Sequence, residues 1–86
     1  MYTIIFDKNV EKELKKIPKR DQVRIIKKIE SLAQDPRPEW ISALQGKLSS
    51  YYRFRMEDYR VIYEVMDKKC VILIVKIAHR SQVYQD

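Results

Sequence analysis

Apolar residues in the first part of the chain predict a short strand followed by two helices. Residues 2–6 are aromatic or β-branched, which is typical of a strand, and Asp7 after them can cap a helix. Apolar side chains then recur at helical spacing until Pro18, which ends the first helix. Asp21 is a candidate N-cap for a second helix, which Pro36 stops. The apolar stripe expected on that helix comprises Val23, Ile26, Ile29, Leu32 and Ala33.

The second half of the chain changes to a period of two and predicts a sheet. Before it, residues 36–48 form an ordered loop, in which we expect Trp40 to pack against the domain rather than to bind a ligand. Alternating apolar and polar residues then predict strands over 51–56 and 59–65. A third strand, 70–78, is apolar on both faces and is therefore expected to be central.

These elements predict an α+β fold in a single domain. The two helices are joined by only a few residues, so they form an antiparallel hairpin that must cover an apolar surface. We expect this hairpin and the N-terminal strand to pack on a twisted, mainly antiparallel four-stranded sheet, followed by a short C-terminal helix. The 86 residues leave room for one core, so the domain is expected to span 1–86.

The charge of the chain favours a polyanionic partner. There are 18 Lys and Arg against 12 Asp and Glu, a formal net charge of +6, which suits RNA, DNA, an anionic membrane surface or an acidic protein. A solvated basic surface is the alternative. Cys70 is the only cysteine, residues 1–15 lack the pattern of a signal peptide, and the longest apolar run is 70–75. We therefore expect a soluble, cytoplasmic protein.

A simple strand register gathers arginines on one face of the sheet. If the turn between the first two sheet strands is the pair Glu57-Asp58, Arg55 lies opposite Arg60. Arg53 then shares their face, and the opposite face is the apolar one that the helical hairpin requires. Glu-Asp is not a preferred hairpin dipeptide, so a longer turn is also open.

Arginines clustered in this way favour an anion as their partner. Like charges directly across a ladder destabilise it, and a planar guanidinium can donate two parallel hydrogen bonds to a phosphate. The alternative is pairing with the acidic side chains of Glu57, Asp58 or Glu64.

The end of the third strand adds the residue types that RNA cleavage needs. His79 and Arg80 follow that strand, and Tyr84 lies one helical turn after Arg80. An imidazole or guanidinium for proton transfer and a ring for base stacking suit a single-stranded RNA substrate, although a lone histidine is often just a surface residue. With one His and one Cys, the chain has no set of metal ligands. We expect a reaction without metal or cofactor.

Two segments resemble the RelE toxins of the RelE/ParE superfamily. These are residues 52–65 and residues 79–84, and the order of elements along the whole chain is similar too, including a loop around Gly46. The resemblance implies a RelE-like fold and a toxin of a type II toxin–antitoxin system. It further implies a ribosome-dependent endoribonuclease, or mRNA interferase, that cuts mRNA in the decoding site and thereby inhibits translation.

The resemblance also implies roles for individual residues. In that family the mRNA 2′-hydroxyl attacks the adjacent phosphate, leaving a 2′,3′-cyclic phosphate and a 5′-hydroxyl. Arg53, Arg55 and Arg60 lie at the positions that bind the phosphate, Arg80 lies where the leaving oxygen is protonated, and Tyr84 stacks on or orients the base. The expected RNA-binding residues are Lys47, Arg53, Arg55, Arg60 and Tyr84.

The group that removes the first proton is not evident from the resemblance. The best-known RelE has lysines at the positions of Arg53 and Arg55, and one of them is assigned as the general base. Arginine is a poor base because its guanidinium stays protonated near neutral pH. Either Arg55 acts only electrostatically and the ribosome or water removes the proton, or neutral His79 takes part.

Two other functions and one protein partner are also considered. A ParE-like toxin would poison DNA gyrase, and a non-catalytic module would only bind RNA. A RelE-like toxin is expected to bind a RelB-like antitoxin through an acidic segment that folds on binding. Its other partners would be mRNA in the ribosomal decoding site and rRNA, and no membrane.

Overall fold

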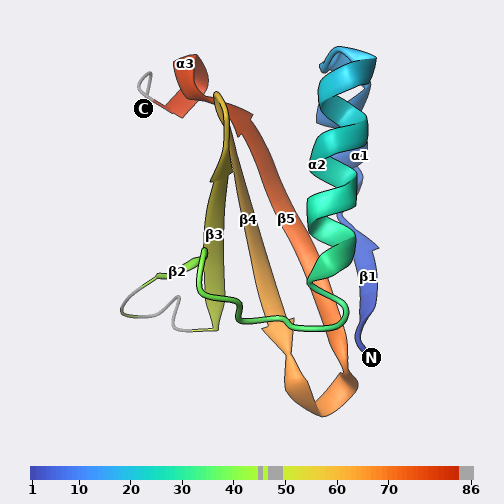
Figure 1. Cartoon of the computed structure of the whole chain (residues 1–86), viewed down its shortest axis with the longest axis vertical. Coiled ribbons are helices and arrows are strands. Elements are labelled where there is room, and N and C mark those ends of the chain that lie inside the picture. The colour runs from blue at the N-terminus through green and yellow to red at the C-terminus, as the bar shows by residue number, and fades with distance from the viewer. Residues whose placement is uncertain (45, 47–49, 84–86) are drawn as a thin grey trace.

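The computed structural model describes residues 1–44, 46 and 50–83 and shows two helices against one face of a sheet (Figure 1). The elements, in chain order, are β1 (Thr3–Phe6), α1 (Lys8–Lys16), α2 (Lys19–Ser31), β2 (Ser42–Ala43), β3 (Tyr51–Met56), β4 (Tyr59–Met66), a 3-10 turn (Asp67–Lys69), β5 (Val71–His79) and α3 (Arg80–Val83). The predicted α+β class is confirmed. None of the described helices is long and apolar enough to cross a membrane.

The sheet has five strands in the order β1-β5-β4-β3-β2. Strand β1 is parallel to β5, and all the other pairs are antiparallel. The predicted count of four strands is wrong by one, because Ser42 and Ala43 pair with β3 inside the segment expected to be a loop. Two residues are too few to show a strand period. The central position predicted for the third sheet strand is confirmed, since β5 lies between β1 and β4.

The residues that begin α1 and α2 suit the unpaired backbone N–H groups at the N-terminus of a helix. The Asp7 side chain accepts a hydrogen bond from the Asn9 backbone N–H, as predicted for a cap of α1. The N-cap of α2 is Pro18 and not Asp21, which lies in the first helical turn. Proline suits a helix start because its fixed φ fits there and its missing N–H would have had no helical partner.

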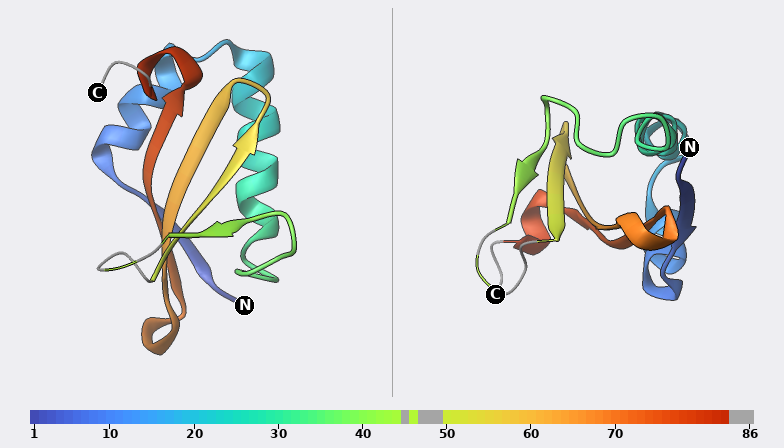
Figure 2. Two further views of the ribbon diagram at one scale, coloured as in Figure 1. Left: turned by 90° about the vertical axis from the view of Figure 1, so that its left-hand side faces the viewer. Right: turned by 90° about the horizontal axis from the view of Figure 1, so that it is seen from below.

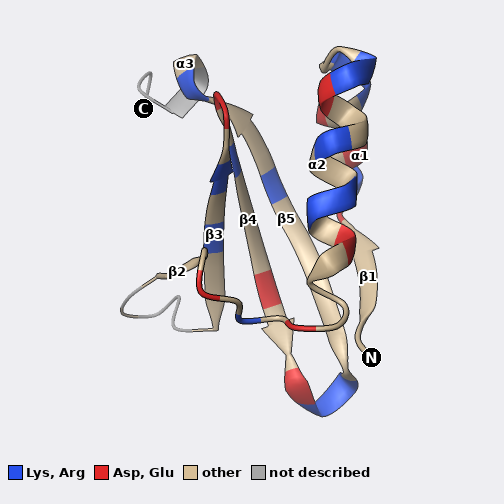
Figure 3. Ribbon diagram, viewed as in Figure 1, with Lys and Arg blue, Asp and Glu red and all other residues tan. Residues whose placement is uncertain are grey.

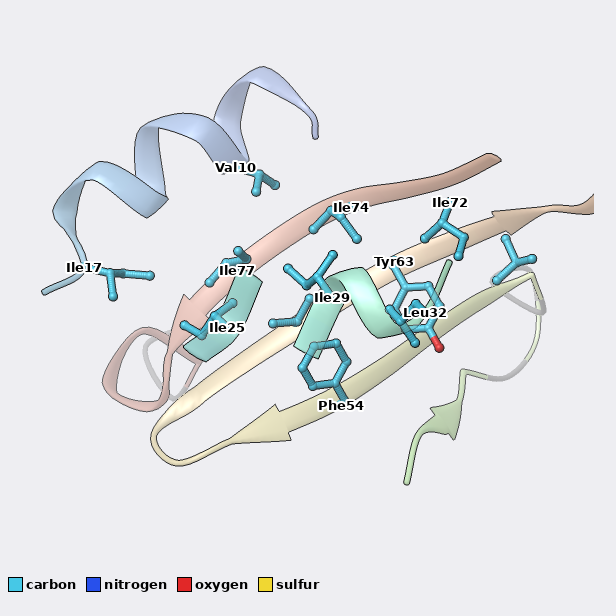
Figure 4. Close-up of a cluster of buried hydrophobic side chains, with 12 residues drawn as sticks. Val10, Ile17, Ile25, Ile29, Leu32, Phe54, Tyr63, Ile72, Ile74 and Ile77 are labelled. Atoms are coloured by element: carbon cyan, nitrogen blue, oxygen red, sulfur yellow. The ribbon is translucent and has the colours of Figure 1, made fainter. Parts of the chain in front are cut away.

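The core lies between the helices and the face of the sheet that they cover (Figures 2 and 4). It contains Val10, Ile17, Ile25, Ile29, Leu32, Phe54, Val61, Tyr63, Val65, Ile72, Ile74 and Ile77. The stripe predicted on α2 is partly wrong: Ile25 is fully buried, whereas Val23 is 55% exposed. Because Ile25 and Ile26 are adjacent, the sequence does not show which of them faces the core. Packing of α2 against the sheet buries Ile25.

Polar contacts tie the segment after α2 to three distant parts of the chain. Arg37 donates to the Asp67 carboxylate at 2.7 and 3.3 Å and to the Tyr52 hydroxyl at 2.8 Å. Tyr2 donates to the same carboxylate at 2.6 Å. The buried Tyr63 hydroxyl donates to the Pro36 carbonyl at 2.8 Å. These contacts hold Pro36 and Arg37 in place, as expected for an ordered loop, although the sequence did not indicate the partners. Residues 45, 47 and 48 of the predicted loop lie outside the described residues.

Trp40 packs against the domain with one edge and stays open to solvent on the other. Its ring meets Phe54 edge to face, with centroids 5.3 Å apart, and the Lys28 ammonium lies 4.5 Å from its centroid. The side chain is 42% exposed and lines a cavity of about 380 Å³ with Met56 and the basic residues of α2. The expected packing role is confirmed for part of the ring.

Replacing Asp67 with Asn should remove a contribution to the free energy of unfolding that the wild type itself loses at low pH. Hydrogen bonds from Arg37 and then Tyr2 hold the pKa of the Asp67 carboxyl below its usual value. Because the folded pKa is the lower one, this stabilisation is present above the ordinary Asp pKa of about 3.9 and is lost as the pH falls through the folded value. Thermal melts should therefore show a gap in Tm between wild type and Asp67→Asn that is constant near neutral pH and shrinks below about pH 4.

A matched control is Glu30→Gln, which replaces an exposed carboxylate that makes no ion pair among the described residues. The difference in Tm between Glu30→Gln and the wild type should not change with pH. A gap between wild type and Asp67→Asn that does not change with pH would show that the carboxylate charge contributes nothing.

Candidate nucleic-acid interface

The register predicted for the arginine-bearing strands is confirmed. Arg55 pairs with Arg60 and Arg53 with Ile62, and Glu57-Asp58 forms a two-residue turn. Glu57 adopts a φ of 55° there, in the left-handed region that a tight hairpin turn requires. The same register places Phe54 opposite Val61 on the buried face. One strand pairing therefore determines both the core and the arginine cluster.

Arg53, Arg55 and Arg60, which we call the arginine face, lie on the side of the sheet opposite α1 and α2. Side chains alternate along a strand, and the neighbouring residues Phe54 and Val61 are buried against the helices. Figure 3 shows basic residues on β3 and β5, and Arg80 begins α3 at one end of the sheet. Arg55 is exposed, whereas Arg53 and Arg60 are half-buried.

The acidic side chains considered as partners of these arginines make other contacts. Glu57 pairs with Arg24 on α2, and Asp58 lies 3.8 Å from the Arg80 guanidinium. Glu64 accepts a hydrogen bond from the Ser50 hydroxyl at 3.4 Å. Within the described ranges, no carboxylate lies within 4.0 Å of the guanidinium groups of the arginine face. Three like charges on neighbouring positions are therefore left to attract an external anion.

Arg80 is brought to the edge of the arginine face by the turn between β3 and β4. As the first residue of α3, it donates its backbone N–H to the Asp58 carbonyl at 2.6 Å. That contact places its side chain near the end of the sheet where Arg55 and Arg60 pair. The role expected of Arg80 at the leaving oxygen stays a prediction.

His79 does not join the arginine face. Its ring meets Tyr59 edge to face, with centroids 5.3 Å apart, and lines a cavity of about 180 Å³ together with Ile77 and residues of α1. Its Nδ1 lies 2.9 Å from the Ser81 hydroxyl and accepts from the Ser81 N–H at 3.2 Å. Because Ile77 is buried under the helices, alternation places His79 on that same side. The part in proton transfer considered for His79 stays a prediction.

Two other predicted site residues, Lys47 and Tyr84, lie outside the described residues. Their assignment to RNA binding stays a prediction.

The sequence interpretation missed Lys76, which the structure places on the same side of the sheet as the arginines. Ile72 and Ile74 are buried, so strict alternation would also turn residue 76 toward the core. The register shifts between Ile62 and Tyr63, which pair with Lys76 and Ile74 and leave Val75 as an extra residue. Lys76 is consequently exposed. The available signal was a single charged residue inside an otherwise apolar run.

Comparison with known proteins places the chain in a family. The sequence profile of the family described as "ParE toxin of type II toxin-antitoxin system, parDE" matches residues 4–84. The mRNA interferase toxin RelE of Escherichia coli (strain K12) is 30% identical over 88 residues, which cover 99% of this chain and 92% of that protein. This chain belongs to the ParE toxin family of type II toxin–antitoxin systems and is a RelE-type toxin.

Solved structures of RelE proteins share the fold. The isolated E. coli RelE toxin superposes with a TM-score of 0.82 at 28% identity, covering 99% of this chain and 93% of that one. RelE in the archaeal RelE–RelB complex from Pyrococcus horikoshii OT3 gives a TM-score of 0.81 at 34% identity, with coverages of 94% and 97%. The helical hairpin on a mixed sheet is thus the RelE architecture.

Proposed function

We propose that this type II toxin is an mRNA interferase, an endoribonuclease that cleaves ribosome-bound mRNA and so inhibits translation. The observation that carries the proposal is the arginine face, whose three guanidinium groups have no carboxylate partner among the described residues. Arg80 contacts the turn next to the pair formed by Arg55 and Arg60. The 30% identical relative from E. coli is named an mRNA interferase, and that similarity supports the same activity here.

In the proposed reaction the 2′-hydroxyl of the mRNA attacks the adjacent phosphate. The O2′–P bond forms and the P–O5′ bond breaks, leaving a 2′,3′-cyclic phosphate and a 5′-hydroxyl. Arg53, Arg55 and Arg60 neutralise the charge that grows on the phosphate oxygens, and each well-placed donor is worth about 3 to 4 kcal/mol in such a site. Arg80 acts at the leaving oxygen, Tyr84 stacks on the base, and Lys47 binds RNA.

The proposed partner that silences the toxin is a RelB-like antitoxin. The archaeal neighbour at 34% identity was solved as a RelE–RelB complex, and this chain carries a net charge of +6. An acidic segment that folds on the toxin surface would complement that charge. A toxin acting on ribosomes works in the cytoplasm, which is the location we propose.

A second candidate function is gyrase poisoning. It is favoured by the description of the matching family as ParE toxins. Poisoning of an enzyme by binding does not require clustered guanidinium groups, whereas phosphoryl transfer is accelerated by cationic donors that stabilise the charge growing on the phosphate. Cleavage is therefore the function that the geometry supports better. An RNA-binding module without catalysis would use the same face but leave its RNA intact.

The proposed function is tested with purified toxin and ribosomes carrying a defined mRNA. Cleavage should occur only when the mRNA is bound in the decoding site, and the upstream fragment should end in a 2′,3′-cyclic phosphate. Replacing the 2′-hydroxyl at the cleaved nucleotide with hydrogen removes the nucleophile and should abolish cleavage at that position. Intact mRNA, together with gyrase-dependent breaks in plasmid DNA, would overturn the proposal in favour of the gyrase function.

A further inference from the structure

The extra residue in β5 turns one lysine onto the arginine face. Val75 has no partner on β4, and the bulge reverses the alternation so that Lys76 is exposed and Ile77 is buried. Bulges are common next to functional sites because they aim a side chain that regular pairing would have turned away. Without this bulge the Lys76 ammonium would have to enter the apolar core, at a high cost in free energy.

The position of Lys76 relative to the arginines follows from the strand register. Lys76 pairs with Ile62, which pairs in turn with Arg53 on the next strand. Strands are about 4.8 Å apart, so the Cα atoms of Lys76 and Arg53 lie roughly 10 Å apart across the sheet. Arg60 pairs with Ala78, two residues beyond Lys76, which makes Lys76 and Arg60 diagonal neighbours at about 7 to 8 Å. Long side chains bridge such separations.

Lys76 differs chemically from every other basic residue on this side of strands β3, β4 and β5. Those strands carry Arg53, Arg55 and Arg60, and Lys76 is their only lysine. A guanidinium keeps its protons at any pH at which the protein works, so it cannot accept one from a hydroxyl. An amine nitrogen has a lone pair once its proton has left, and lysines act as general bases for that reason.

The histidine that could have served as the proton acceptor is on the wrong side of the sheet. The His79 ring lies with Tyr59 on the helix side, and its Nδ1 contacts Ser81. An attacking 2′-hydroxyl at a phosphate bound by Arg53 and Arg60 would therefore lie on the opposite face. Lys76 is on that face.

We propose that Lys76 is the general base of the cleavage reaction, a role that rests on the proposed mRNA interferase function. The neutral Lys76 amine takes the proton from the 2′-hydroxyl as the O2′–P bond forms. The P–O5′ bond breaks, and the 5′-oxygen takes one proton from the Arg80 guanidinium, which regains a proton from water. The Lys76 ammonium then returns its proton to water, so that the enzyme is unchanged.

Charged groups stand on several of the elements around Lys76. They are Arg60 and Glu64 on β4, Arg53 and Arg55 on β3, Arg80 at the start of α3, and Asp7, whose backbone N–H donates to the Ile74 carbonyl of β5 at 3.1 Å. The cations outnumber the carboxylates among these groups.

The test measures the single-turnover rate of mRNA cleavage on programmed ribosomes against pH, with ribosome binding measured separately by co-sedimentation. Lys76→Arg keeps the charge but cannot give up its proton. We expect it to lower the rate by at least about 100-fold, the lower end of general-base effects, while ribosome binding changes less than threefold. The rise of the wild-type rate with pH should be lost. Lys68→Arg, on the exposed turn before β5, is the matched control and should leave the rate unchanged.

A chemical rescue separates a base from a merely structural lysine. In a Cys70→Ser background, which removes the exposed native thiol, Lys76→Cys is alkylated with 2-bromoethylamine. The product carries an amine on a side chain of nearly the same length as lysine, with sulfur in place of the γ-methylene. Because this amine is more acidic than that of lysine, activity should return with its pH dependence moved to lower pH. Failure to regain activity in this protein, if it still binds ribosomes, would contradict the proposal.

Lys76→Arg with wild-type rate and pH profile would overturn the proposal and reduce Lys76 to a charge that binds phosphate. That result would leave the mRNA interferase function intact, because the wild type would still cleave. If the wild type itself fails to cleave mRNA on programmed ribosomes, the proposed function fails, and the role of Lys76 fails with it.

Discussion

Replacing Arg55 and Arg60 together by Ala lowers the rate of mRNA cleavage on the ribosome by at least about 10³-fold, because a single lost donor to a developing oxyanion costs about 10² to 10³. The two residues pair directly across β3 and β4 next to the turn that carries the Arg80 contact. Both side chains act on the same phosphate in the proposed site. The measurement is single-turnover cleavage at saturating toxin, which removes weakened binding from the comparison.

This double substitution should not lower the stability of the folded protein. Like charges directly opposite each other destabilise a ladder, so removing both relieves repulsion. The melting temperature is therefore expected to stay the same or to rise. A matched control is the pair Arg20→Ala and Lys27→Ala, which removes two exposed positive charges from α2. A control that loses activity as severely would show that net charge, and not the arginine face, is responsible.

Ile29→Ala lowers the free energy of unfolding by about 2 to 5 kcal/mol, the usual cost of emptying a fully buried aliphatic site. Ile29 has no exposed surface and lies between α2 and the sheet (Figure 4). A small domain is stabilised by only about 5 to 15 kcal/mol in total, so this loss should lower the midpoint of urea unfolding markedly.

Val23→Ala is the control from the same helix. Val23 is 55% exposed, and alanine has the higher helix propensity, so the change should be within about 0.5 kcal/mol of zero. This pair also tests which stripe of α2 faces the sheet. Equal losses for both variants would contradict the observed helix phase.

The register of β3 and β4 could be predicted because two independent requirements agree on it. Burying Phe54 and Val61 while exposing the arginines leaves one pairing with a short turn, and that pairing is the observed one. The side of the sheet on which Lys76 lies could not be predicted in this way. The exposure of Lys76 depends on a bulge in β5. The residues on both sides of Lys76 are apolar, so the sequence shows no alternation from which the position of the bulge could be predicted.

Other misses have similar physical causes. Residues 42 and 43 become a strand only because β3 offers them an open edge, which is a tertiary effect. His79 was considered for proton transfer because it stands beside Arg80 in the chain, but its ring lies on the helix side of the sheet, since consecutive strand residues point to opposite faces. Contacts such as Arg37 with Asp67 join residues 30 positions apart, and no local pattern encodes them.

We propose that the arginine face cleaves mRNA on translating ribosomes. Primer extension on a reporter mRNA after induction of the toxin tests it directly, with a second reporter that lacks its start codon. We predict breaks within codons of the translated reporter, none in the untranslated one, and none in either when Arg55 and Arg60 are replaced by Ala. Growth arrest with both mRNAs intact, or equal cleavage of the two reporters, would contradict it.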